Sequence, residues 1–187
     1  LHQIKPHFLQ NALMSIKVLC RTRPKEAEQA VYDFAVFLRG NMNALESAEM
    51  ILFREECKTI ERYLHIEKMR FGERLQVQWD LQEEKFQIPP LTIQPLVENA
   101  VCHGICQKME GGTVQIRSFR KNGEICVQIL DDGAGFDTEK LKDADGIAIR
   151  NLKLRLKEFL NADLEIESRT GEGCRQTIHI PWEETED

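Results

Sequence analysis

A histidine and an asparagine near the start of the chain could form a nucleophilic pair. Apolar residues recur here at helical spacing, and His7 lies off the stripe that they form, so its imidazole is predicted to face solvent. Asn11 follows one helical turn later on the same side and could orient the ring through a hydrogen bond. A neutral imidazole is a competent nucleophile at pH 7, although a lone histidine is also typical of an ordinary surface position.

A second group of polar residues interrupts a largely apolar segment in the middle of the chain. Burying polar side chains in an apolar helix costs free energy unless they line a site, and this helix contains Glu98, Asn99 and His103. The amide oxygen of Asn99 is a hard ligand of the kind that Mg²⁺ prefers, and His103 follows one turn later on the same side. The alternative interpretation is a capped helix of the core that binds nothing.

A carboxylate and two glycines follow a predicted strand further along the chain. Asp131 stands at the end of this strand, where its carboxylate can accept a hydrogen bond from an exocyclic amine. Gly133 and Gly135 would let the backbone approach a ligand closely. Because any turn can contain a Gly-x-Gly pattern, this signal is weak by itself.

Two more segments with glycines lie near the C-terminus. Gly146 precedes a predicted helix that contains Asn151, and the N–H groups at the start of a helix favour phosphate. Gly171 and Gly173 link the last two predicted strands.

The elements that must position these residues divide the chain near residue 72. The first seventy residues are predicted to form three helices, because glycine is nearly absent and apolar residues recur at intervals of three and four. The second helix is expected to begin at Pro24. Its apolar stripe consists of Ala27, Ala30, Val31, Phe34, Leu38 and Leu45. Three such helices cannot easily close a core alone, so a helical partner is expected.

Beyond residue 72 the pattern changes to strands, turns and single helices. Strands are predicted over residues 75–81, 113–119 and 125–130, a hairpin over 163–181, and helices over 91–105 and 147–160. An Asn-Gly pair at residues 122–123 is a strong hairpin signal, and residues 131–146 are predicted to form a mobile loop. The fold class is therefore α+β, with helices packed on a mixed sheet.

The composition of the 187 residues is that of a globular protein, with 42% apolar and 30% charged residues. A net charge of −6 and a pI near 5.5 argue against a nucleic-acid partner. No apolar run approaches the roughly 20 residues needed to span a bilayer. Since the chain begins without Met, we expect a cytoplasmic fragment of a longer protein. Its six cysteines are expected to be reduced, and Cys102, His103 and Cys106 lack a second ligand pair at zinc-site spacing.

Several motifs occur along the chain in a characteristic order. They are Gln-Ile-Lys-Pro-His-Phe-Leu-Gln-Asn at residues 3–11, Tyr-Leu-His-Ile-Glu-Lys-Met-Arg-Phe at 63–71, Ile-Pro-Pro-Leu-Thr-Ile-Gln-Pro-Leu-Val-Glu-Asn-Ala-Val-Cys-His-Gly at 88–104, and then the glycine segments. In this order they resemble the GHKL ATPase superfamily and, within it, the sensor histidine kinases of the LytS/YehU type.

The resemblance implies a role for each candidate residue. It makes His7 the phosphoacceptor, Asn99 the ligand of Mg²⁺ and phosphate, and Asp131 the group that binds the adenine amine of ATP. The other positions would form the nucleotide site: His103 lining it, Gly133 and Gly135 at its floor, Gly146 in the ATP lid, Asn151 in the helix after the lid, and Gly171 and Gly173 on its far side.

The activity implied is ATP-dependent autophosphorylation of His7, followed by transfer to an Asp of a response regulator receiver domain. Residues 1–72 would be the helical phosphoacceptor and dimerisation segment, and residues 73–187 a GHKL (Bergerat-type) α/β sandwich that binds ATP. The resemblance also implies a homodimer through the N-terminal helices and a parent protein that is tethered to a membrane, with this part in the cytoplasm.

Two other functions are compatible with the same motifs. A GHKL ATP hydrolase carries a Glu four residues before the position of Asn99 to activate water, whereas this chain has Pro95, which can do no acid–base work. A degenerate nucleotide-binding scaffold with weak or no kinase activity is the other alternative, because Cys102, Ala148 and Cys174 depart from the family pattern.

Overall fold

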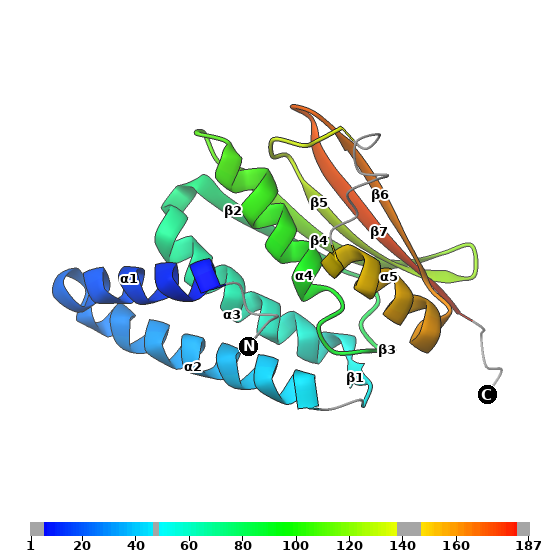
Figure 1. Ribbon diagram of the computed structural model, residues 1–187, viewed down its shortest axis with the longest axis horizontal. Helices are drawn as coiled ribbons and strands as arrows, with labels where there is room; N and C mark the ends of the chain where they lie inside the picture. The colour runs from blue at the N-terminus through cyan, green and yellow to red at the C-terminus, as the bar shows by residue number, and fades with distance from the viewer. Residues whose placement is uncertain (1–5, 47–48, 138–146, 183–187) are drawn as a thin grey trace.

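The computed structural model describes residues 6–46, 49–137 and 147–182. Helices form the N-terminal part, and a five-stranded sheet follows, with two further helices on one face of that sheet (Figure 1). Within the described ranges, none of the helices is long and apolar enough to cross a lipid bilayer.

The first helix, α1 (Pro6–Thr22), is amphipathic in the predicted way. Its buried residues are Phe8, Ala12, Ile16 and Leu19. Their spacing of four, four and three keeps them on one side of the helix. His7 is exposed, so the position of His7 off the predicted stripe is confirmed, and so is the stripe itself over the described residues; its first two members, Leu1 and Ile4, lie outside them.

The second helix, α2 (Pro24–Glu46), begins at Pro24 as predicted and buries or half buries most of its predicted stripe. Its buried residues are Ala27, Ala30, Asp33, Phe37 and Asn41. Val31 is 51% exposed, so the predicted stripe is wrong at this position, and the side chain of Leu45 lies outside the described residues. Apolar residues occupy two sides of α2, and packing against α1 and α3 decides which side is buried.

Helix α3 (Phe53–Phe71) joins the N-terminal helices to the rest of the chain. The sequence predicts an apolar stripe on this helix, and its residues are buried except for Phe71, which is half buried: Phe53, Cys57, Ile60, Leu64 and Phe71. The ring of Tyr63 lies 5.1 Å from that of Phe8 and 6.0 Å from that of Phe37, centroid to centroid. Because α3 also contacts α4 and β2, the three helices share one core with the sheet. The chain's own C-terminal part therefore supplies some of the packing surface that we expect these helices to need from a partner.

The sheet has the strand order β2-β4-β5-β7-β6. Its strands are β2 (Leu75–Leu81), β4 (Gly112–Lys121), β5 (Glu124–Asp131), β6 (Asp163–Arg169) and β7 (Gly173–Pro181). Strand β2 pairs parallel to β4, and the other neighbours pair antiparallel, so the predicted mixed sheet is confirmed. Asn122 and Gly123 have φ values of 53° and 77°, the left-handed backbone that the tight β4–β5 turn requires.

A second, two-stranded sheet does not follow from the sequence pattern. Strand β1 (Ile51–Leu52) pairs antiparallel with β3 (Gln87–Ile88). Alternation of apolar and polar residues cannot be recognised in strands of two residues, so only the folded chain shows this contact.

Helices α4 (Gln94–Asn99) and α5 (Ile147–Leu160) cover one face of the five-stranded sheet (Figure 1). Helix α5 has the predicted bounds. Helix α4 begins three residues later than predicted, after Leu91, whose φ of 57° is not helical, and it continues through a π-helical turn (Ala100–Gly104). Such turns are frequent at functional sites.

Candidate functional site

Asp131, the last residue of β5, is a buried acceptor at the end of the sheet. It is 7% exposed, and its Oδ1 accepts a hydrogen bond of 3.0 Å from the backbone N–H of Gly133. Burial raises the pKa of Asp131 to about 6, although the N–H groups of Gly133 and Cys174 act in the opposite direction. The ionised carboxylate, dominant above that pH, is suited to a ligand that donates a hydrogen bond, such as an exocyclic amine.

Three glycines pack directly around Asp131. A Cβ atom on Gly104 would lie 2.4 Å from Oδ1 of Asp131, and one on Gly173 would lie 1.9 Å from its carbonyl oxygen. A Cβ atom on Gly133 would lie 2.3 Å from the backbone of Gly104. Sequence reasoning misses Gly104, and the signal that could have found it is its place at the end of the motif at residues 88–104.

The segment after β5 lies against the β6–β7 hairpin. The N–H of Gly171 donates a hydrogen bond of 2.7 Å to the carbonyl of Ala134, and Oγ of Ser168 donates one of 2.8 Å to the carbonyl of Gly173. Gly135 has a φ of 58°, in the region that favours glycine. Four predicted site residues therefore meet at one corner of the sheet: Gly133, Gly135, Gly171 and Gly173.

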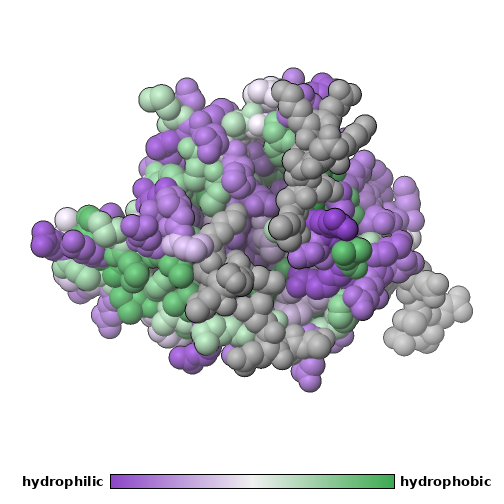
Figure 2. All heavy atoms as spheres, viewed as in Figure 1, coloured by the Kyte–Doolittle hydropathy of each residue, from purple (hydrophilic) through white to green (hydrophobic). Residues whose placement is uncertain are grey.

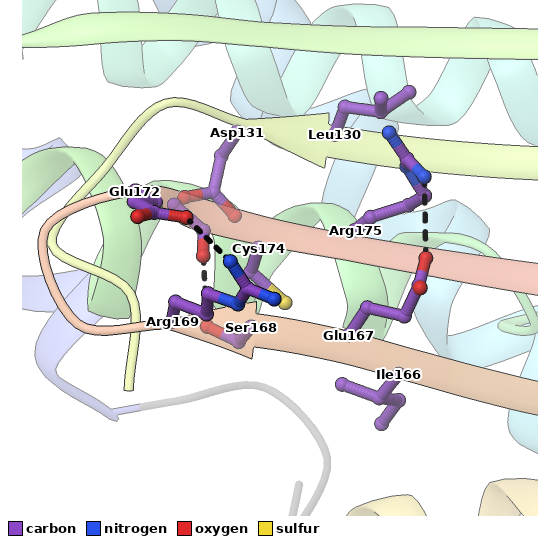
Figure 3. Close-up of a pocket in the computed structure, with 10 residues that line it drawn as sticks. Leu130, Asp131, Ile166, Glu167, Ser168, Arg169, Glu172, Cys174 and Arg175 are labelled. Carbon is purple, nitrogen blue, oxygen red and sulfur yellow. Dashed lines mark hydrogen bonds and ion pairs between the residues drawn. The ribbon is translucent and has the colours of Figure 1, made fainter. Parts of the chain in front are cut away.

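An open pocket of about 520 Å³ lies at this corner, within the size range of small-molecule sites. Figure 3 shows Asp131 in it together with two ion pairs, Arg169–Glu172 at 3.7 Å and Arg175–Glu167 at 3.2 Å. Its described lining residues are Leu130, Asp131, Ile166, Glu167, Ser168, Arg169, Glu172, Gly173, Cys174 and Arg175.

Helix α4 and its π-helical continuation carry the second group of predicted residues. Nε2 of Gln94 donates hydrogen bonds of 2.9 Å to Glu98 and to Asn41 of α2. Glu98 is 8% exposed and so belongs to a buried polar network that joins α4 to α2. Asn99 is half buried and His103 is exposed, and neither is among the described residues that line the pocket in Figure 3.

Glu56 of α3 holds the start of α4, a role that sequence reasoning misses. Its Oε1 accepts hydrogen bonds from the backbone N–H groups of Ile93 at 2.6 Å and Gln94 at 2.9 Å. Burial raises the pKa of Glu56 to about 7, while these two N–H groups and nearby Arg155 favour the ionised form. The signal in the sequence is a glutamate directly beside Cys57, on the apolar stripe of α3.

The predicted pair on α1 is in hydrogen-bond contact. Nδ2 of Asn11 lies 3.0 Å from Nδ1 and 3.2 Å from Nε2 of the exposed His7, which confirms the contact that their four-residue spacing predicts. The amide can donate to whichever ring nitrogen carries no proton. Asn151 is exposed on α5, and Gly146 lies outside the described residues.

The donor chemistry of these residues fits a magnesium–nucleotide complex. Asp131 offers a buried acceptor beside a pocket, and glycines allow the backbone to come close to it. Asn99 offers an amide oxygen, the ligand type of Mg²⁺, on the helix that leads to Gly104.

Two family models match this chain. One, described as histidine kinase, matches residues 1–75, and the other, described as histidine kinase-, DNA gyrase B-, and HSP90-like ATPase, matches residues 90–184. The fold agrees with a solved structure, the histidine kinase domain of the blue-light activated histidine kinase EL346 from Erythrobacter litoralis. That comparison has a TM-score of 0.55 and 19% identity, and it covers 96% of this chain and 90% of the other. The C-terminal part thus has the fold of a GHKL-type ATPase domain.

Curated relatives place the chain more narrowly. YwpD of Bacillus subtilis is 36% identical over 98% of this chain and 69% of its own length. The sensor histidine kinase BtsS of Escherichia coli is 34% identical over 96% of this chain, and the sensor protein LytS of Bacillus anthracis is 31% identical over 96%. The chain belongs to the histidine kinases, and its relatives include LytS. It spans about a third of the length of the two sensor proteins.

Proposed function

We propose that this chain is the kinase core of a two-component sensor, which binds Mg-ATP beside Asp131 and phosphorylates His7. The observation that carries the proposal is the buried carboxylate of Asp131 at an open pocket that Gly173 also lines, in a chain that belongs to the histidine kinases. Residues 1–72 form the phosphoacceptor and dimerisation segment, and residues 73–187 form the ATP-binding catalytic domain.

Each site residue has a separate task in nucleotide binding. The ionised carboxylate of Asp131 accepts a hydrogen bond from the adenine amine. Asn99 supplies an amide oxygen to Mg²⁺, which neutralises phosphate charge when it is bound. The polar positions His103 and Asn151 contact the nucleotide. The glycines allow close backbone approach at the floor, lid and far side of the site: Gly133, Gly135, Gly146, Gly171 and Gly173.

His7 is the nucleophile of the reaction. Its unprotonated ring nitrogen attacks the γ-phosphoryl group, and most of the catalysis consists of positioning and charge neutralisation. Asn11 orients the ring through the hydrogen bond that the two side chains make. The phosphoryl group then passes to an Asp of a response regulator receiver domain.

The N-terminal helices offer a surface for a second copy of the chain. Leu13, Met14 and Val18 of α1 are each at least 55% exposed, and Val31 and Tyr32 of α2 are each at least 51% exposed. Figure 2 shows hydrophobic residues gathered over α1 and α2. Burying this surface between two copies forms a four-helix arrangement. In the parent protein, we infer that this core lies in the cytoplasm, tethered to a membrane sensor.

Incubation with γ-labelled ATP and Mg²⁺ tests the proposal. We expect one acid-labile, alkali-stable phosphate per chain on His7, located by mass spectrometry at alkaline pH. His7→Gln removes the label, whereas the matched variant His65→Gln, which changes another exposed histidine, keeps it. Label that persists in His7→Gln would overturn the assignment of the phosphoacceptor.

The same variant separates the kinase from the two alternatives. Pro95 lies in the first turn of α4 and offers no acid–base group, so phosphate release should depend on His7. If the His7→Gln variant released phosphate as fast as the parent protein does, the result would favour a hydrolase. Failure of calorimetry to detect Mg-ATP binding would favour a scaffold.

A further inference from the structure

Three side chains of different donor chemistry meet on the sheet face opposite α4 and α5. Ile125 and Val127 of β5 are fully buried on the helix-covered face. Strand alternation therefore places Glu124 and Cys126 on the other face. Cys126 pairs directly with His179 of β7, which brings the three side chains together.

The distances among these side chains are close to those of a metal site. Nδ1 of His179 lies 2.9 Å from Oε2 of Glu124 and 3.9 Å from Sγ of Cys126. The three donor atoms all lie within 4.8 Å of one another. Ligand atoms of a tetrahedral zinc site stand about 3.3–3.6 Å apart, given its bond lengths. Small rotations of these side chains would reach that geometry.

Glu165 of β6 lies on the other side of the histidine ring. Its Oε2 is 3.5 Å from Nε2 of His179. When Nε2 carries the proton and faces this carboxylate, Nδ1 presents its lone pair toward Cys126 and Glu124. Carboxylates orient metal-binding histidines in this way.

We propose that Glu124, Cys126 and His179 bind one Zn²⁺ ion on this face of the sheet. Glu165 is a positioning residue that holds His179 in the ligating tautomer. A thiolate and an imidazole favour Zn²⁺ over Mg²⁺, which takes oxygen ligands. The thiolate and the carboxylate together neutralise the charge of the ion, and the fourth position is left for water.

Cys126 is a buried residue, 3% exposed, so its side chain is held in place on this face of the sheet. The site is also separate from Asp131, which lies five residues along β5 on the opposite face, about 16 Å away. The proposal consequently does not depend on the function proposed above.

Titration with Co²⁺ as a spectroscopic probe, followed by displacement with Zn²⁺, tests this site on the whole chain. We expect one Co²⁺ per chain, with a thiolate-to-cobalt charge-transfer band and the intense visible bands of a tetrahedral ion. Cys126→Ser should abolish the charge-transfer band. His179→Gln and Glu124→Gln should each weaken binding at least tenfold, and Glu165→Gln should weaken it by about 10- to 100-fold.

Matched controls separate this site from chance binding by other thiols. Cys20→Ser changes an exposed cysteine of α1 and should leave the spectrum unchanged. Circular dichroism of each variant checks the fold, and the two carboxylate variants alter the surface without disturbing the core. If Cys126→Ser keeps the band, or if Glu124→Gln and His179→Gln bind as the parent does, the proposal is overturned. A parent protein that binds neither Co²⁺ nor Zn²⁺ would overturn the proposal too.

Discussion

Replacing Glu56 by Gln should make the protein more stable at pH 8 and leave its stability nearly unchanged at pH 5. In the folded chain, the pKa of Glu56 is raised from 4.5 to about 7, mainly by burial. Between these two pH values the folded state keeps a proton that the unfolded state has released. The stability of the parent protein therefore falls as the pH rises through this window.

The size of the effect follows from the shift of the pKa. Because its pKa is about 7 in the folded chain against 4.5 ordinarily, ionised Glu56 costs about 3 kcal/mol of folding free energy above pH 7. The amide oxygen of Gln can still accept the N–H groups of Ile93 and Gln94, so the start of α4 keeps its hydrogen bonds. At pH 5 both side chains are neutral in the folded chain, and the unfolded Glu56 has ionised only in part, so we expect the two proteins to agree within about 1 kcal/mol.

Urea unfolding followed by far-ultraviolet circular dichroism, at several pH values between 5 and 8.5, measures the difference. Glu55→Gln is the matched control, because Glu55 is an exposed neighbour that pairs with Lys58, and its removal should change stability by less than about 1 kcal/mol. Asp131 titrates in every variant, so its contribution cancels in the comparison. A difference between Glu56→Gln and the parent that stays constant with pH would refute the reasoning. A Gln variant less stable than the parent at pH 8 would refute it as well.

Three further predictions concern the nucleotide site and the phosphoacceptor. Asp131→Asn should abolish Mg-ATP binding in calorimetry. The affinity of the parent protein for Mg-ATP should fall by up to about tenfold per pH unit below about pH 6, where the carboxylate takes up a proton. Unchanged binding in either test would count against this role of Asp131. Asn11→Ala should slow phosphorylation of His7 in a labelling time course, while the ATP affinity measured by calorimetry stays the same. Loss of ATP affinity would instead indicate that Asn11 has a structural role. Gly173→Ala should lower the free energy of unfolding in urea by at least about 2 kcal/mol, because the new Cβ would lie 1.9 Å from a carbonyl oxygen. Gly171→Ala has open space around its Cβ and should lower it by only about 1 kcal/mol, from its positive φ alone. Equal losses of stability would contradict the packing argument.

The periodicity of apolar residues determined most of the secondary structure. The stripe of α1, the turn at Asn122–Gly123 and the strands of the five-stranded sheet follow from local spacing, because helices and strands impose periods of 3.6 and 2 on their buried sides. The four-residue spacing of His7 and Asn11 likewise predicts their contact, since both lie on one helix.

Contacts between elements far apart in the sequence were decided only by the tertiary structure. Val31 is exposed because α2 is apolar on two sides, and its neighbours α1 and α3 select one of them. Gly104 meets Asp131 only when α4 lies on the sheet. Glu56 looks misplaced on an apolar stripe until the N–H groups at the start of α4, 37 and 38 residues later, are brought against it. Local pattern shows which residues prefer burial, but the partner that satisfies a buried polar group is chosen by long-range packing.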